Sequence, residues 1–191
     1  MVERLSSMKS KLIPGHFGAS GVAGVVLGER PVAILQQVAG WQGFEDVAAP
    51  MLADLGLTGL GGYRSAQVVK GCTAWRTAPD KVLIEGAKDL SPYANDELVT
   101  LDLSHARTAI TLRGANARDV LAQVIAIDTS PQAFTVGDFL QTGIHHVGVL
   151  IHCTAADSFE ILTPVTWAET LWEVLEHNAA PFGYEISKDA A

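Results

Sequence analysis

The chain has few basic residues and very few cysteines. Its 191 residues include 13 Lys and Arg against 21 Asp and Glu, which gives a formal net charge of −8. A nucleic-acid partner requires clustered basic side chains, so this balance argues against nucleic-acid binding. Only Cys72 and Cys153 are present, too few for a disulfide-stapled scaffold. A reducing, cytoplasmic location is expected, with one disulfide as the alternative.

Long hydrophobic runs are also missing. The apolar stretch Val22–Leu27 contains Gly24 and follows Pro14, which leaves no segment of signal-peptide or transmembrane length. No membrane partner is therefore expected. Charged residues make up only 18% of the chain and hydrophobic residues 48%. A surface with that composition carries more apolar area than a free monomer needs, which favours a protein with protein partners.

The sequence contains no recognisable catalytic or phosphate-binding motif. There is no G-x-S-x-G turn, and the glycine-rich stretches 15–24 and 59–62 fit neither G-x-G-x-x-G nor a P-loop. Asp102, Ser104 and His105 are the residue types of a hydrolase triad, but Ser104 and His105 are neighbours that point to opposite faces of an extended segment. We interpret Asp102 and Ser104 as residues that turn the chain by side-chain to backbone hydrogen bonds. No catalytic residue is predicted.

A metal site is not predicted either, although histidines cluster near the end of the chain. His146 and His152 are six residues apart, about 20 Å along an extended strand, whereas metal ligands must converge. His145 is expected to point to the opposite face from His146. Cys153 follows His152 directly and is expected to face away from it, which argues against a Cys–His nucleophile.

The second half of the chain shows a strand, a helix and a hairpin in succession. Alternating apolar positions predict a half-buried strand over residues 108–113 that ends at Gly114. Asn116 is the expected N-cap of a helix over residues 117–125. The hairpin then joins residues 145–152 to 159–162.

The first half repeats this order. Residues 32–38 predict a strand, a helical stripe runs from Phe44 to Leu55, and residues 73–76 and 81–85 predict a hairpin. Pro50 interrupts the stripe and should kink the helix or mark a late start. We therefore predict an α+β fold of two pseudo-repeated β-α-β-β halves, with mixed or antiparallel sheets covered by helices.

The expected domain organisation is one domain over residues 21–180, with halves at about 30–86 and 107–178. A mobile arm over residues 1–20 precedes it, and a tail over residues 181–191 follows. The closing helix is indicated by a capping box, Thr166 with Glu169. Its apolar seam consists of Ala168, Leu171, Trp172 and Leu175, which should pack on the second sheet.

These patterns carry a resemblance to a known family. D-L-S-x-x-R at 102–107, the strand, R-G at 113–114, the helix and D-T-S at 128–130 resemble the folate-binding domain of the glycine-cleavage T-protein superfamily. With GVVLGERPVAILQQVAGW at 24–41 and TWAETLWEVLEHN at 166–178, the chain resembles the gamma subunits of heterotetrameric sarcosine oxidases over roughly residues 20–180.

The resemblance implies a non-catalytic subunit that supports flavin-dependent oxidative demethylation of sarcosine, with alpha, beta and delta subunits as partners. FAD, FMN, NAD and tetrahydrofolate are expected in those partners and none in this chain. Folate-binding relatives carry an acidic G-G-x-x-D-D-like segment where this sequence has His145–Leu150, so the carboxylate that would hold a pterin is missing. The alternatives are a free-standing folate-binding one-carbon protein, which would need Asp102 or Glu160, or a small ligand-binding homodimer.

Two aromatic residues are candidates for a subunit interface. Trp41 follows a predicted strand and Phe44 opens the first predicted helix. An exposed aromatic side chain at such a junction suits a protein contact.

Overall fold

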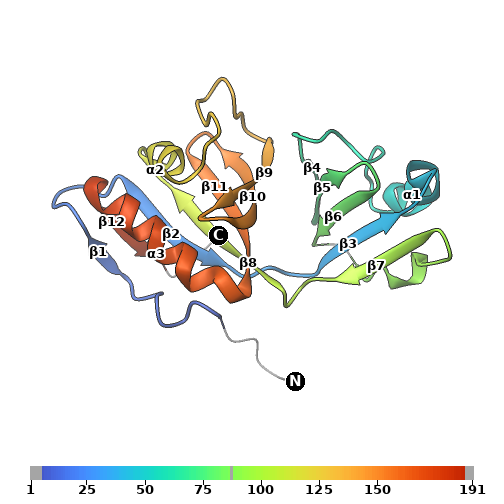
Figure 1. The fold of residues 1–191 in the computed structure, drawn as a ribbon, viewed down its shortest axis with the longest axis horizontal. Helices are drawn as coiled ribbons and strands as arrows, with labels where there is room; N and C mark the ends of the chain where they lie inside the picture. Colours follow the sequence, from blue (N-terminus) through green and yellow to red (C-terminus); the bar gives the residue numbers. More distant parts are fainter. Residues whose placement is uncertain (1–5, 87, 188–191) are drawn as a thin grey trace. The chain divides into compact units, whose positions relative to one another are not determined.

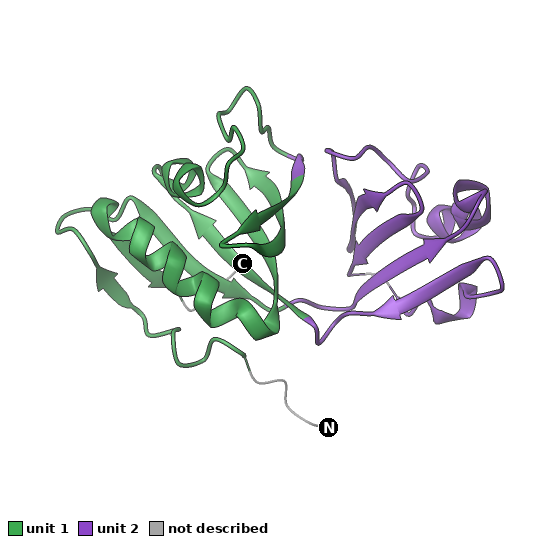
Figure 2. Cartoon of the chain, in the orientation of Figure 1, with its two compact units in different colours: residues 1–31, 107–136, 140–191 green, residues 32–106, 137–139 purple. Residues whose placement is uncertain are grey.

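The computed structural model describes residues 6–86 and 88–187 (Figure 1). The chain divides into two compact units, which are distinguished in Figure 2. Unit 1 takes in residues 1–31, 107–136 and 140–191, and unit 2 takes in residues 32–106 and 137–139. The chain thus enters unit 2 after Pro31 and returns to unit 1 at Arg107.

Unit 1 is built on a seven-stranded sheet. In spatial order its strands are β1 (Gly15–Phe17), β12 (Tyr184–Ser187), β2 (Val25–Arg30), β8 (Arg107–Arg113), β11 (Ser158–Pro164), β10 (Val147–Ala155) and β9 (Phe139–Ile144). The β12–β2 pair is parallel, whereas β1–β12, β2–β8, β8–β11 and β10–β11 are antiparallel. The helices α2 (Ala117–Val124) and α3 (Ala168–Ala179) lie beside one another and share one core with this sheet.

Unit 2 is built on a five-stranded sheet. Its order is β4 (Gln67–Val69), β5 (Cys72–Ala78), β6 (Lys81–Glu85), β3 (Leu35–Gly40) and β7 (Leu98–Asp102). Helix α1 (Phe44–Asp54) covers one face, where Phe44, Ala48 and Met51 pack on Val38 and Ile84. The short 3₁₀ helix Ser91–Tyr93 precedes β7.

The same order of elements occurs in both units, as the sequence periods predicted. In unit 2 the order along the chain is β3, α1, β4, β5 and β6, and the four strands lie in the sheet in the order β4-β5-β6-β3. In the second repeat the order along the chain is β8, α2, β9, β10 and β11, and its four strands lie in the order β9-β10-β11-β8. Each repeat has three strands after its helix, one more than expected. The predicted α+β fold of two repeated halves with a mixed and an antiparallel sheet is confirmed.

Strand β8 is buried more completely than its alternating pattern predicted. All five residues from Thr108 to Leu112 are buried. The alternation of threonine with apolar residues indicated a strand with one solvated face. In the fold β8 is the middle strand of seven. The face of β8 that carries Thr111 is therefore shielded from solvent, as is the face that carries Ile110.

The described segments nearest to the two ends of the chain pack into unit 1. Met8 is fully buried in the core, and β1 pairs with β12. Ser10 donates a hydrogen bond to Glu169 on α3 (2.7 Å). Residues 6–17 and 184–187 are therefore not the free arm and tail that the sequence predicted. Residues 1–5 and 188–191 lie outside the described part of the chain.

The helices begin close to the predicted positions, but the predicted capping hydrogen bonds do not form. Asn116 stands at the N-cap of α2, but its side chain donates to Asp119 (2.8 Å) and makes no capping bond to the backbone. The Thr166–Glu169 capping box does not form, because a 3₁₀ turn over Val165–Trp167 precedes α3. Helix α1 begins at Phe44 and continues through Pro50, so the late start is not observed.

The connection between β9 and β10 is a two-residue turn. Its residues are His145 and His146, with φ values of 46° and 67°. Two-residue hairpin loops of type I′ require positive φ at both positions, which Asn-Gly adopts with much less strain than other pairs. His145 and His146 therefore lie in a turn and not on the strand where the sequence analysis placed them.

We expect the double variant His145→Asn/His146→Gly to raise the free energy of unfolding by about 1 kcal/mol, because it relieves the unfavourable φ at both positions. The change is measured by urea denaturation of the two proteins. His145→Ala/His146→Ala is the matched control and should lower stability. If Ala-Ala proves as stable as Asn-Gly, the turn is not strained.

Candidate functional site

The two aromatic interface candidates have opposite environments. Trp41 lies in the bend after β3 and its side chain is 61% exposed. Phe44 is only 3% exposed and belongs to the core under α1. A Cβ at Gly40 would lie 2.5 Å from the Phe44 ring, so the ring packs directly on that glycine. Phe44 is therefore not an exposed aromatic, and its place in the apolar stripe of α1 is the signal for its burial.

Strand β7 carries two further exposed apolar side chains. Val99 is 44% exposed and Leu101 is 53% exposed. In the register with β3 they stand opposite Ala39 and Gln37, on the face of the sheet that α1 does not cover. We call Trp41, Val99 and Leu101 the β7 strip. Val99 and Leu101 were not predicted from the sequence, because an apolar residue on a strand is usually assigned to the core.

Other large apolar side chains are exposed singly elsewhere. They are Ile13, Phe17, Val22, Ile34, Tyr63, Val68, Ile127, Val136 and Trp167. Scattered exposure of this kind is common on protein surfaces.

The histidine and cysteine cluster does not converge. His145 and His146 are exposed in the β9–β10 turn, and His152 is buried on β10 opposite Glu160. Cys153 is buried on the other face, where its thiol donates to the Ala155 carbonyl (3.2 Å). Within residues 6–86 and 88–187, no three His, Cys, Asp or Glu side chains are grouped so that they could hold a metal ion.

Neither cysteine forms a disulfide. Cys72 lies in the core of unit 2 and Cys153 in the core of unit 1. Burial raises the pKa of the Cys72 thiol. A raised pKa disfavours the nucleophilic thiolate, so Cys72 is a core residue in this structure. The alternative of one disulfide is not observed.

Asp102 and Ser104 turn the chain after β7, as the sequence indicated. Asp102 Oδ1 accepts hydrogen bonds from the Ser104 backbone N–H (2.9 Å) and the Ser104 hydroxyl (2.5 Å). The Leu35 backbone N–H donates to Ser104 Oγ (3.0 Å). Both groups are occupied by the fold itself, which accounts for them without catalysis.

The bonds from Ser104 hold the pKa of the Asp102 carboxyl below its ordinary value. A lowered pKa in the folded state stabilises the protein above the unfolded pKa, and this contribution is lost as the pH falls through the lowered value. We expect the free energy of unfolding of Asp102→Asn to fall less steeply between about pH 5 and pH 3 than that of the unmodified chain, since the amide stays neutral. Urea denaturation as a function of pH measures this. Ser104→Ala keeps the backbone donor and should be intermediate, and an unchanged slope in both variants would contradict the assignment.

Glu160 is engaged by an arginine of the same sheet. Arg30 Nε and Nη2 donate to the two carboxylate oxygens of Glu160, both at 2.8 Å. The two side chains are 23% and 21% exposed. A bidentate guanidinium–carboxylate pair of this geometry is among the stronger charge-assisted contacts in proteins. Glu160 therefore already has a cationic partner within the chain.

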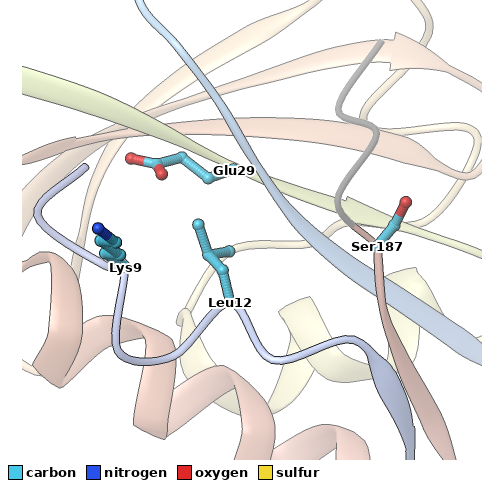
Figure 3. Close-up of a pocket in the computed structure, with 4 residues that line it drawn as sticks. All are labelled: Lys9, Leu12, Glu29 and Ser187. Atoms are coloured by element: carbon cyan, nitrogen blue, oxygen red, sulfur yellow. The ribbon is translucent and has the colours of Figure 1, made fainter. Parts of the chain in front are cut away.

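A pocket of ≈ 330 Å³ opens beside Glu29 of unit 1 (Figure 3). It is lined by Lys9, Leu12, Glu29 and Ser187. The Glu29 carboxylate accepts hydrogen bonds from Thr108 Oγ1 (2.7 Å) and from the Ser6 hydroxyl. The sequence analysis missed this pocket, because Lys9, Leu12 and Ser187 belong to segments it took for free ends.

None of the helices in the described part of the chain combines the length and apolar character needed to cross a bilayer.

Known proteins resemble the chain in sequence over one part and in fold over almost all of it. The model of the sarcosine oxidase, gamma subunit family matches residues 92–181. No curated protein matches the sequence significantly. The fold is similar to a chain of the heterotetrameric sarcosine oxidase from Corynebacterium sp. U-96, solved in complex with pyrrole 2-carboxylate. That likeness has a TM-score of 0.79 and 22% identity and covers 98% of this chain and 99% of the other.

A second solved structure supports the fold assignment. The glycine cleavage system aminomethyltransferase T from Bartonella henselae matches with a TM-score of 0.55 and 19% identity, over 83% of this chain and 49% of that one. This chain therefore corresponds to about half of the aminomethyltransferase. The family match and the fold agree with the resemblance noted in the sequence. The model of the sarcosine oxidase, gamma subunit family thus matches slightly less than half of the chain, residues 92–181, and the fold of nearly the whole chain is similar to that of a chain in a heterotetrameric sarcosine oxidase.

Proposed function

We propose that this chain is the non-catalytic gamma subunit of a heterotetrameric sarcosine oxidase. The complex carries out flavin-dependent oxidative demethylation of sarcosine to glycine, with hydrogen peroxide and either methylene-tetrahydrofolate or formaldehyde as further products. The alpha, beta and delta chains are its partners. FAD, FMN, NAD and tetrahydrofolate bind to those chains, and the contribution of this chain is assembly.

The observation that carries the proposal is the family match over residues 92–181 together with the likeness of nearly the whole chain to a chain of the Corynebacterium complex. The exposed apolar side chains of the β7 strip support it, since apolar surface of this kind commonly marks a protein contact.

The state of the two candidate carboxylates is consistent with a subunit that binds no pterin. A pterin presents adjacent N–H donors and needs a free carboxylate that can accept from them. Asp102 accepts from Ser104, and Glu160 accepts from both arms of the Arg30 guanidinium. Both oxygens of Glu160 and one oxygen of Asp102 are therefore engaged within the chain, which favours the assembly role over the folate-binding alternative.

Co-expression tests the proposal directly. The alpha, beta and delta chains of the same host are expressed with and without this chain, and the soluble oxidase is purified through a tag on the beta chain. We expect this chain to co-purify in a one-to-one ratio and the yield of active oxidase to fall when it is omitted. A chain that never joins the others, while the oxidase stays active and stable without it, would refute the assignment.

Expression of the chain by itself tests the cofactor assignment. The purified chain should be colourless, and tetrahydrofolate should leave its tryptophan fluorescence unchanged. Stoichiometric flavin absorbance or saturable folate binding would instead support an autonomous cofactor-binding protein.

A further inference from the structure

An edge of the sheet in unit 2 has an apolar surface that the fold does not use. Strand β7 is the last strand of this sheet, beside β3 (Figure 1). Leu98 of β7 is 1% exposed and belongs to the core under α1. Val99 and Leu101 lie on the opposite face and remain about half exposed. Edge strands of soluble proteins are commonly protected by charged side chains, and the outer face of β7 has valine and leucine instead.

Trp41 extends this surface at the end of β3. It directly follows Gly40, the last residue of β3, which pairs with Leu98 of β7, so its backbone lies next to the start of the strip. Its side chain is 61% exposed. Tryptophan is the residue most enriched among side chains that dominate binding energy at protein interfaces.

Carboxylates border the strip at the start of β7. Asp96 and Glu97 precede the strand, and both are exposed, whereas Asp102 at the other end alternates onto the face of Leu98. The loop that carries the first two is held in place, because Asn95 Oδ1 accepts from the backbone N–H groups of Glu97 (2.8 Å) and Leu98 (3.0 Å). A preorganised loop loses little conformational freedom on binding. Lys81, opposite Ala39 on the same face, is exposed as well.

We propose that the β7 strip is the docking surface through which this chain binds another subunit of the oxidase, at an apolar patch bordered by Lys or Arg side chains. This inference rests on the proposed function. An apolar centre with a charged border is the usual composition of a specific interface, and opposite charge on the two borders accelerates association.

The acidic border argues against a second copy of this chain as the occupant. In a two-fold symmetric contact the same patch meets itself, so Asp96 and Glu97 of both copies would come close to one another. The net charge of −8 adds to this repulsion. A partner whose patch is bordered by Lys or Arg side chains would bring no like charges together at this border.

The test compares variants of the full-length chain for binding to the alpha–beta–delta complex purified without it. Trp41→Ala/Leu101→Ala removes the two most exposed side chains of the strip, and we expect the dissociation constant to rise about 100-fold or more. The control is Val22→Ala/Val136→Ala, which truncates side chains that are 96% and 59% exposed outside the strip. Its dissociation constant should stay within about threefold of that of the unmodified chain. All these residues are exposed, and thermal melting confirms that each variant folds.

The charged border is tested by Asp96→Lys/Glu97→Lys. We expect association with the complex to slow by about tenfold at low salt, with the difference fading at high salt because screening weakens charge steering. Faster association of this variant would overturn the basic border assigned to the partner.

The outcomes separate this inference from the proposed function. If the unmodified chain binds the complex and Trp41→Ala/Leu101→Ala binds equally well, the strip is not the docking surface and the gamma-subunit role stands. If the unmodified chain does not bind at all, both proposals fail. A stable homodimer of the isolated chain that dissociates in the strip variant, measured by sedimentation, would overturn the choice of partner.

Discussion

Replacement of Trp172 by alanine is expected to lower the free energy of unfolding by about 4 kcal/mol, the typical cost of deleting a buried tryptophan side chain. Trp172 is fully buried on the inner face of α3, in one seam with Ala168, Leu171 and Leu175. The seam belongs to the same core as Ile110 of β8. For a chain of this length the loss corresponds to a melting temperature lower by roughly 10 °C, which calorimetry measures.

Trp172→Phe is the matched control. The indole Nε1 is buried and has no hydrogen-bond partner among the described residues. Phenylalanine keeps most of the ring volume and removes this unpaired donor, so the expected loss is about 1 kcal/mol. A phenylalanine variant as unstable as the alanine variant would mean that the indole N–H makes an important bond, and the packing explanation would then fail.

The second large effect is expected at Gly114, where β8 turns toward α2. Its φ is +116°, and an added Cβ would lie 2.5 Å from the carbonyl oxygen of Gly24. Gly114 also donates its N–H to the Asp157 carbonyl (3.0 Å), and its own carbonyl accepts from Ala117 (2.9 Å). Because the three nearest atoms all belong to the backbone of Gly24 and Val25, the turn cannot easily move aside for a side chain. Gly114→Ala should therefore cost about 3 kcal/mol or more.

Gly21→Ala provides the comparison that isolates the steric clash. Gly21 has nearly the same φ, +120°, but a Cβ there would meet no atom within 4 Å. Its replacement should cost about 1 kcal/mol, which reflects the backbone conformation by itself. Urea denaturation of both variants measures the difference. Equal losses at the two positions would show that the close approach to Gly24 is unimportant.

The variants Trp172→Ala and Gly114→Ala also serve as stability controls for the binding experiment. Trp172 and Gly114 belong to unit 1, whereas the β7 strip belongs to unit 2. A variant that merely lowers stability weakens apparent binding only by reducing the folded fraction. Trp172→Ala should thus reduce binding far less than Trp41→Ala/Leu101→Ala at a temperature where both variants are folded.

Local periodicity was sufficient to place the first strand, the helix and the hairpin of each repeat, although it missed β4 and β9. The strand at 107–113, the helix at 117–124 and the hairpin β10–β11 lie where alternation and helical spacing predicted them. The seam of α3 is buried at each of its four predicted positions. These features depend on neighbours within one turn or one strand, so the order of residue types contains the information.

The tertiary structure decided which faces are covered and what each polar group contacts. Burial of Thr111 on β8 follows from the strand order, and the pairing of β1 with β12 joins segments about 170 residues apart. Arg118 is another example, because its guanidinium donates to the carbonyls of Thr129 and Ala156 from distant loops.

For the candidate site, the sequence by itself indicated a resemblance to the gamma subunits of sarcosine oxidases and the absence of a recognised catalytic motif, since both can be read from residue types in order. It also identified Trp41 as a candidate. Only the tertiary structure excluded Phe44 and added Val99 and Leu101, because exposure depends on whether a neighbouring element covers a side chain. Helix α1 covers one face of the unit 2 sheet, and its packing against that face is a long-range contact that no local pattern specifies.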